Sequence, residues 1–145
     1  MKMLMGIGNI LRCDDGIGVF VSDNFSHQDW EAVSCGTAPE NFTSVVRHKK
    51  PELLVLVDAA DMNIPAGEFR VIPYEKIRDV GIGTHQLPLT HLIDYLSESA
   101  EEIMLIGIQP AFVTGGDEIS EGVRAGALRL TEILKAGDLE RISVL

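Results

Sequence analysis

LLVLV, residues 53–57, is a continuous apolar run, and the acidic stretch Asp58-Ala59-Ala60-Asp61 follows it directly. Such a run is typical of a central strand that is covered on both faces of a sheet. An earlier apolar run, Met1 to Ile7, is followed a few residues later by Asp14-Asp15. Open α/β sheets build their functional sites at the carboxyl ends of such strands. The two runs therefore predict an α/β sheet that carries carboxylates along one edge.

Strand-like apolar segments alternate with amphipathic, helix-like segments along the 145 residues. The spacing predicts strands over residues 1–7, 31–34, 53–57, 69–72 and 102–108, and helices over residues 16–25, 41–48, 89–96 and 119–134. The turn Asn63–Gly67 is too short for a crossover helix, so we expect the strand that follows it to be antiparallel to its predecessor. This order predicts a three-layer α/β/α sandwich with a mostly parallel sheet.

The topology expected for this sandwich places the two acidic turns together. Right-handed crossovers around a central first or third strand create a switch point between these two strands. Asp15 and Asp58 would then face each other across one crevice at that point. A loop histidine, His85 in Gly83-Thr84-His85-Gln86-Leu87-Pro88, follows later in the chain.

Composition narrows the class of protein. The formal net charge is -10, which argues against binding to a phosphate backbone. Hydrophobic residues make up 46% of the chain, enough for the core of one domain over residues 1–145, but no apolar run reaches membrane-spanning length. The apolar start lacks the features of a signal peptide. Cys13 and Cys35 have no metal-binding spacing, so we expect a reducing, cytoplasmic compartment.

Each candidate site residue also has an ordinary structural interpretation. Asp14 and Asp15 precede a predicted helix, where an acid stabilises the helix start. One such acid suffices, so we expect Asp14 to cap or form the turn and Asp15 to point into the crevice. Asp58 is equally compatible with a turn residue, and a lone loop histidine such as His85 commonly binds a backbone carbonyl. Two carboxylates and an imidazole from separate loops are also a reasonable ligand set for a metal ion.

Two other chemistries are disfavoured by the sequence. Gly6-Ile7-Gly8-Asn9 lacks the third glycine of a dinucleotide-binding fingerprint, because Leu11 stands at that position, so no organic cofactor is expected. Carboxylates beside Cys13 disfavour the negatively charged thiolate and so oppose its use as a nucleophile. Since the chain shows no paired Ser-His-Asp or Cys-His signature, we do not expect an acyl-enzyme.

Taken in order, several short motifs resemble the hydrogenase maturation protease family. The resemblance covers nearly the whole chain and is carried by Gly8-Asn9, Asp14-Asp15-Gly16-Ile17-Gly18, Gly36-Thr37-Ala38-Pro39-Glu40-Asn41, Val57-Asp58-Ala59-Ala60-Asp61-Met62, Pro65-Ala66-Gly67, Thr84-His85-Gln86-Leu87-Pro88-Leu89 and Gly107-Ile108-Gln109-Pro110. The Ala-Pro-Glu-Asn and Gly-Ile-Gln-Pro pieces look most like the branch that serves hydrogen-evolving or formate-linked hydrogenases.

The resemblance implies a twisted sheet of five strands, one of them antiparallel, and an endopeptidase that trims the C-terminal tail of the large subunit of nickel-iron hydrogenases. It implies Asp15, Asp58 and His85 as the catalytic and metal-binding residues. It also implies that the nickel is carried transiently by the substrate, so that cleavage checks metal insertion. One departure is Ser34-Cys35-Gly36, where many members have Asp-Gly-Gly, so a catalytic role for an acid there does not transfer.

We therefore predict a cytoplasmic, aspartyl-type endopeptidase, expected as a monomer, whose partner is a nickel-loaded hydrogenase large-subunit precursor. The metal would position the tail, and Asp15 or Asp58 would accept a proton from the attacking water. Two alternatives remain open: a non-catalytic chaperone that checks the metal, and an unrelated metal-dependent hydrolase. Neither nucleic acid nor a membrane is an expected partner.

Overall fold

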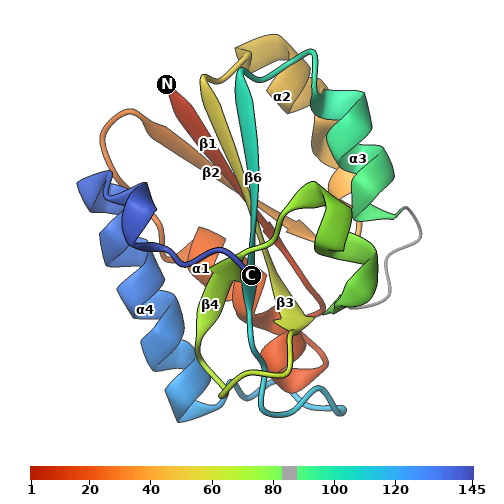
Figure 1. Ribbon diagram of the computed structural model, residues 1–145, viewed down its shortest axis with the longest axis vertical. Coiled ribbons are helices and arrows are strands. Elements are labelled where there is room, and N and C mark those ends of the chain that lie inside the picture. Colours follow the sequence, from red (N-terminus) through yellow and green to blue (C-terminus); the bar gives the residue numbers. More distant parts are fainter. Residues whose placement is uncertain (83–87) are drawn as a thin grey trace.

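The computed structural model describes residues 1–82 and 88–145, and in them a mixed sheet is covered by helices on both faces (Figure 1). Five strands are neighbours in the order β2-β1-β3-β6-β4, and a short sixth strand, β5, pairs with β3. Their bounds are β1 (Lys2–Ile7), β2 (Trp30–Gly36), β3 (Leu53–Asp61), β4 (Phe69–Val71), β5 (Gly81–Ile82) and β6 (Glu102–Ile108). The predicted α/β/α class is confirmed, with one short strand more than the five expected.

In the described residues, three α-helices and three 3-10 turns lie between strands, and a fourth of each follows β6. The helices are α1 (Ile17–Asp23), α2 (Thr43–Lys49), α3 (Leu89–Leu96) and α4 (Glu121–Ala136). The 3-10 turns are η1 (Cys13–Gly16), η2 (Pro39–Phe42), η3 (Tyr74–Asp79) and η4 (Leu139–Arg141). Gly137 directly follows α4, and its φ of 76° is a left-handed conformation that glycine adopts readily at the end of a helix.

The pairing of the strands creates the expected switch point. β1 lies between β2 and β3 and is parallel to both, and β6 runs parallel to β3 on its other side. The chain therefore moves outward from β1 to β2 and then returns to the opposite side of β1 with β3. The carboxyl ends of β1 and β3 are adjacent, which is where an open sheet of this kind forms a crevice.

Alternation along the strands supplies two apolar cores. In the central strand, Leu54 and Leu56 face α2 and α3, whereas Val55 and Val57 face α1 and α4. Figure 1 shows these two pairs of helices on opposite faces of the sheet. Each side chain of this size stabilises the fold by about 1.5–3 kcal/mol when it is buried. The continuous apolar run of β3 is thus explained by burial on both faces.

Very close packing fixes α1 against the sheet. A Cβ atom added at Gly18 would lie 2.2 Å from the carbonyl oxygen of Ile7 and 2.3 Å from that of Val57. No side chain fits in this space, so the helix start lies directly on the end of β1 and on the middle of β3. η1, which immediately precedes this glycine and contains Asp15, is thereby held at the switch point.

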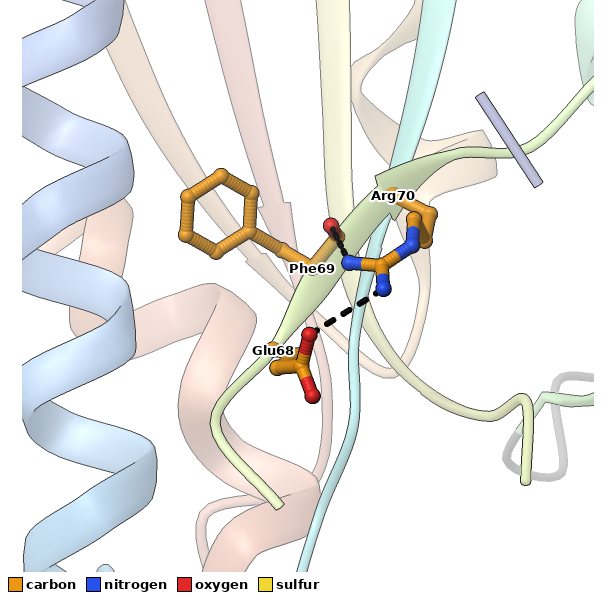
Figure 2. A network of polar contacts seen from close by, with 3 residues as sticks. All are labelled: Glu68, Phe69 and Arg70. Carbon is orange, nitrogen blue, oxygen red and sulfur yellow. Dashed lines mark hydrogen bonds and ion pairs between the residues drawn. The ribbon is translucent and has the colours of Figure 1, made fainter. Parts of the chain in front are cut away.

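The start of β4 is braced by local polar contacts. Figure 2 shows Arg70 donating one hydrogen bond to the Phe69 carbonyl oxygen, 2.8 Å away, and another to the Glu68 carboxylate at 3.1 Å. The Phe69 ring points toward α4 and packs against the core there. The backbone beside these contacts also binds Gln109. The Gly67 N–H donates to the Gln109 carbonyl oxygen, and the Gln109 N–H donates to the Glu68 carbonyl oxygen.

Some predicted boundaries and partners were wrong. β3 continues to Asp61, so Asp58 lies inside a strand and not in a turn, and β2 is also longer than expected. The predicted helix over residues 16–25 starts at Ile17, after a 3-10 turn, and the last helix starts at Glu121. β4 has the antiparallel direction predicted for it, but its partner is β6 rather than the preceding strand.

Candidate active site

A cavity of about 480 Å³ opens at the carboxyl-terminal edge of the sheet, beside the switch point. Residues from the loop after β1, from β3, from β5 and from the segment after β6 line it: Arg12, Asp15, Ala59, Asp61, Gly81, Ile82, Gln109, Pro110, Ala111 and Val113. Two of its charged groups are carboxylates and one is a guanidinium. The cavity therefore combines acidic groups with an apolar wall formed by the other loops.

Asp15 is the buried carboxylate of this cavity. Its side chain is only 8% exposed, although it lines the cavity wall. No hydrogen bond or ion pair joins this carboxylate to another residue within 1–82 or 88–145. Its oxygens are not among the fully buried polar atoms that lack a partner, so they face the cavity. Asp15 therefore has the burial and orientation of a group that binds a ligand.

Asp14, the neighbouring acid, performs a different task. Its buried carboxylate accepts hydrogen bonds from the N–H groups of Ala111 and Phe112, at 2.8 and 2.9 Å. It accepts two more from Ser120, from the N–H at 2.6 Å and from the hydroxyl at 2.7 Å. Burial raises the pKa of Asp14, but the hydrogen bonds from Ser120, Phe112 and Ala111 outweigh this effect and lower its pKa below the ordinary value. Asp14 thus holds the segment after β6 and does not cap the helix that follows it, so the capping role predicted for it was wrong. Asp15 lines the cavity, the orientation predicted for it.

Asp58 is buried within β3, with 1% of its side chain exposed. It does not belong to the cavity lining, although the next residue, Ala59, does. Alternation places the Asp58 side chain on the face of Leu56 and Ala60, which carries α3, whereas Ala59 and Asp61 point to the opposite face. Asp58 and Asp15 thus lie at the same edge of the sheet, and η1 packs against β3.

A carboxamide that the sequence analysis did not select completes the described part of the site. Gln109 is buried and lines the cavity, and its Oε1 accepts a hydrogen bond from the Met62 N–H at 2.6 Å. Its Nε2 donates to the Asp61 carboxylate at 3.1 Å. This hydrogen bond, followed by one from the Asn63 N–H, lowers the pKa of Asp61. The signals in the sequence were the position of Gln109 after the last strand and its place in the motif Gly107-Ile108-Gln109-Pro110.

The predicted histidine, His85, lies outside the described residues, so its role stays a prediction. Within residues 1–82 and 88–145, no group of three or more histidine, cysteine, aspartate or glutamate side chains lies close enough to hold a metal ion. Ile82, the last described residue before the His85 segment, lines the cavity. The described chain before residue 83 therefore ends at the cavity wall.

The departure at the end of β2 is structural in this chain. Ser34 forms hydrogen bonds with Ser22 and Asp23, which tie β2 to α1. Burial raises the pKa of the Cys35 thiol to about 12, so this group stays protonated and is a poor nucleophile. Neither residue lines the cavity.

Comparison with known proteins agrees with this geometry. A family model described as hydrogenase maturation protease matches residues 21–136. The hydrogenase 3 maturation protease of Escherichia coli K12 is 36% identical over 115 residues, covering 77% of this chain and 74% of that protein. The chain belongs to the hydrogenase maturation protease family.

Solved structures of hydrogenase maturation proteases share the fold over nearly the whole chain. The solution structure of the endopeptidase HycI from Escherichia coli has a TM-score of 0.85 and 29% identity, and the match covers 95% of this chain and 91% of that one. HycI from Thermococcus kodakarensis KOD1 has a TM-score of 0.81 and 33% identity, with 93% and 90% covered. The predicted activity class, a peptide-bond hydrolase of this family, is thus confirmed. No helix in the described part of the chain is long and apolar enough to cross a membrane.

Proposed function

We propose that this endopeptidase removes the C-terminal tail of a nickel-iron hydrogenase large-subunit precursor and uses the precursor's own nickel for recognition. The observation that carries the proposal is the Asp15 carboxylate, which is 8% exposed, lines the cavity and has no partner among the described residues. An anionic group that faces a cavity and is bound by no other described residue favours a cationic ligand. A metal ion that arrives with the substrate supplies that charge at the moment of recognition.

Asp15, Asp58 and His85 are the proposed contacts to the nickel. Carboxylate oxygens and imidazole nitrogens are both suitable ligands for a divalent transition metal. Three protein ligands leave coordination positions for groups of the precursor and for water. Asp61 and Gln109 are placed along the same cavity, so an extended tail that enters it meets hydrogen-bond acceptors as well as an apolar wall.

The proposed reaction is direct hydrolysis. A water molecule gives a proton to one carboxylate, Asp15 or Asp58, while its oxygen bonds to the scissile carbonyl carbon. The carbon–nitrogen bond then breaks, and the leaving amine takes up the proton. No covalent enzyme intermediate is required, in keeping with a Cys35 thiol that stays protonated.

Substitution of the three proposed residues tests this function. We expect Asp15→Asn, Asp58→Asn and His85→Ala each to abolish shortening of the nickel-loaded precursor, because an amide or methyl group cannot replace the lost metal ligand. Gel mobility of the precursor and the thermal midpoint of each folded variant are the measurements. Asp29→Asn is a matched control, since Asp29 is exposed at the opposite edge of the sheet, where its carbonyl oxygen binds the start of β1. Full activity of all three site variants would remove the proposed site.

The same assay separates the alternatives. A chaperone that only checks the metal would bind the loaded precursor without shortening it. An unrelated metal-dependent hydrolase would cleave generic peptides when metal is added and no precursor is present. The expected result is cleavage of the precursor alone.

A further inference from the structure

Four exposed apolar side chains lie in the two loops that carry Arg12 and Val113 of the cavity lining, and Val113 itself is one of the four. Ile10 and Leu11, in the loop after β1, are 57% and 69% exposed, and Phe112 and Val113, after β6, are 65% and 38% exposed. These four residues, here called the apolar rim, are four of the nine large apolar side chains that the described part of the chain exposes. Figure 1 shows the two loops side by side at the lower end of the sheet.

The apolar rim is held in place by hydrogen bonds between its two loops. Gly116 N–H donates to the Leu11 carbonyl oxygen at 2.9 Å, and Cys13 N–H donates to Gly116 at 2.8 Å. The Arg12 side chain donates to the Val113 carbonyl oxygen at 3.1 Å. Because the backbone is fixed in this way, the apolar side chains stay exposed instead of collapsing onto the core.

Asp14 joins the apolar rim to the proposed active site. Its carboxylate binds the N–H groups of Ala111 and Phe112, and its own N–H donates to the Phe112 carbonyl oxygen at 2.9 Å. The next residue, Asp15, is the buried carboxylate of the cavity. Asp14 thus fixes the loop that carries Phe112 and Val113, and its neighbour Asp15 lines the cavity. Arg12 and Val113 line the cavity as well.

We propose that the apolar rim is the docking surface for the folded body of the metal-loaded hydrogenase precursor, next to the base of its tail. This inference rests on the proposed function. A cavity of about 480 Å³ has room for only a short part of a tail, so a folded substrate that delivers a metal to it must approach the surrounding rim. Exposed apolar side chains that are gathered in two joined loops beside a functional cavity are typical of a protein interaction site.

Replacement of two rim residues tests the docking surface. For Leu11→Ser/Phe112→Ser we expect KM for the loaded precursor to rise by about tenfold while kcat stays close to the wild-type value, because the change removes binding that is equal in the ground and transition states. The conservative variant Leu11→Met/Phe112→Leu should keep the wild-type KM. The control Tyr95→Ser/Leu128→Ser removes two apolar side chains of similar exposure from α3 and α4, at 53% and 49%, and should leave KM unchanged.

Binding measured separately from cleavage keeps this inference distinct from the proposed function. We expect Leu11→Ser/Phe112→Ser to bind the loaded precursor more weakly than the wild-type protein does, as measured by light scattering. This result is expected whether or not the wild-type protein cleaves the precursor. An unchanged affinity and KM in that variant would overturn the docking surface. So would a fall in kcat alone, or a wild-type dimer that the substitution converts to monomers, since the rim would then serve another purpose.

Discussion

At the scale of single residues, two adjacent aspartates with the same chemistry have opposite roles. Asp14 is fully satisfied by four hydrogen bonds, whereas the Asp15 carboxylate lines a cavity and binds no other described residue. Their positions in the 3-10 turn η1 point one side chain toward the segment after β6 and the other toward the crevice. The local backbone, rather than the residue type, therefore decides which acid is structural.

Asp14→Asn should destabilise the protein without removing a ligand of the proposed metal site. An amide offers one acceptor oxygen in place of two, so buried donors lose their partner, and we expect a loss of about 3 kcal/mol in the free energy of unfolding. The pKa of Asp14 is lowered in the folded protein, so its stabilising effect is present above the ordinary pKa and is lost as pH falls through the folded-state value. Urea unfolding at several pH values checks this, and the gap between wild type and variant should narrow in acid. A gap that does not change with pH would contradict this role.

Gln109→Glu should introduce repulsion at the cavity. Oε1 can still accept the Met62 N–H, but the group facing the Asp61 carboxylate changes from a donor to a second carboxylate. Two like charges at hydrogen-bond distance raise the pKa of at least one of them. We expect a lower thermal midpoint and slower precursor processing at pH 7, with the thermal midpoint partly recovering near pH 5, where one group takes up a proton.

The control for this substitution is Gln109→Leu, which removes the hydrogen bonds and adds no charge. Its deficit in thermal midpoint should change less between the two pH values. Equal behaviour of the glutamate and leucine variants at both pH values would show that Gln109 does not hold the Asp61 carboxylate.

At the scale of secondary-structure elements, the fit between α4 and the turn before β4 depends on two glycines. A Cβ atom added at Gly126 would lie 1.9 Å from the Gly67 carbonyl oxygen, whereas one added at Gly122 meets nothing within 4 Å. Gly67 itself has a φ of 89°, which side chains other than glycine rarely adopt. This contact positions the turn whose backbone binds Gln109.

Gly126→Ala and Gly122→Ala are therefore a matched pair. Alanine favours a helix over glycine by up to about 1 kcal/mol, so Gly122→Ala should be neutral or slightly stabilising. Gly126→Ala should instead destabilise by about 1–3 kcal/mol, because a backbone carbonyl cannot move aside as a flexible side chain does. Chemical denaturation of both variants is the measurement. Equal stability of the two would show that α4 does not pack against this turn.

Elements with a strong apolar pattern can be predicted from the sequence. The ends of strands are harder to predict where they depend on pairing with a strand that is distant in the sequence. α3 and β6 begin and end at the predicted residues, because burial on defined faces gives them a clear period. The sequence predicts a turn at Asp58, because an acidic residue after an apolar run commonly marks the end of a strand. In the structure Asp58 pairs with Gly107 of β6, and this pairing extends β3 beyond the apolar run. Gln109 was missed because its hydrogen bonds to Met62 and Asp61 join segments that are far apart in sequence.

At the scale of the whole molecule, the net negative charge and the carboxylates at one edge of the sheet favour a substrate that carries a positive charge. The net charge is -10, and Asp15, Asp58 and Asp61 all lie at the carboxyl-terminal edge of the sheet. An acidic surface of this kind attracts a cationic group and repels an anionic one. Arg12 is the one basic side chain among the described residues that line the cavity.

Cleavage should consequently depend on the metal as well as on the tail. A nickel ion bound by both molecules contributes to the affinity for loaded precursor only, so it discriminates loaded from empty substrate. Rates measured on the two forms, each with the same C-terminal tail, should differ by at least about tenfold, which corresponds to about 1.4 kcal/mol of differential binding. Adding nickel to the empty precursor before the assay is the control and should restore the rate. Equal rates on loaded and empty precursor would exclude recognition through the metal. The protein would still be a processing endopeptidase in that case, because it would cleave both forms.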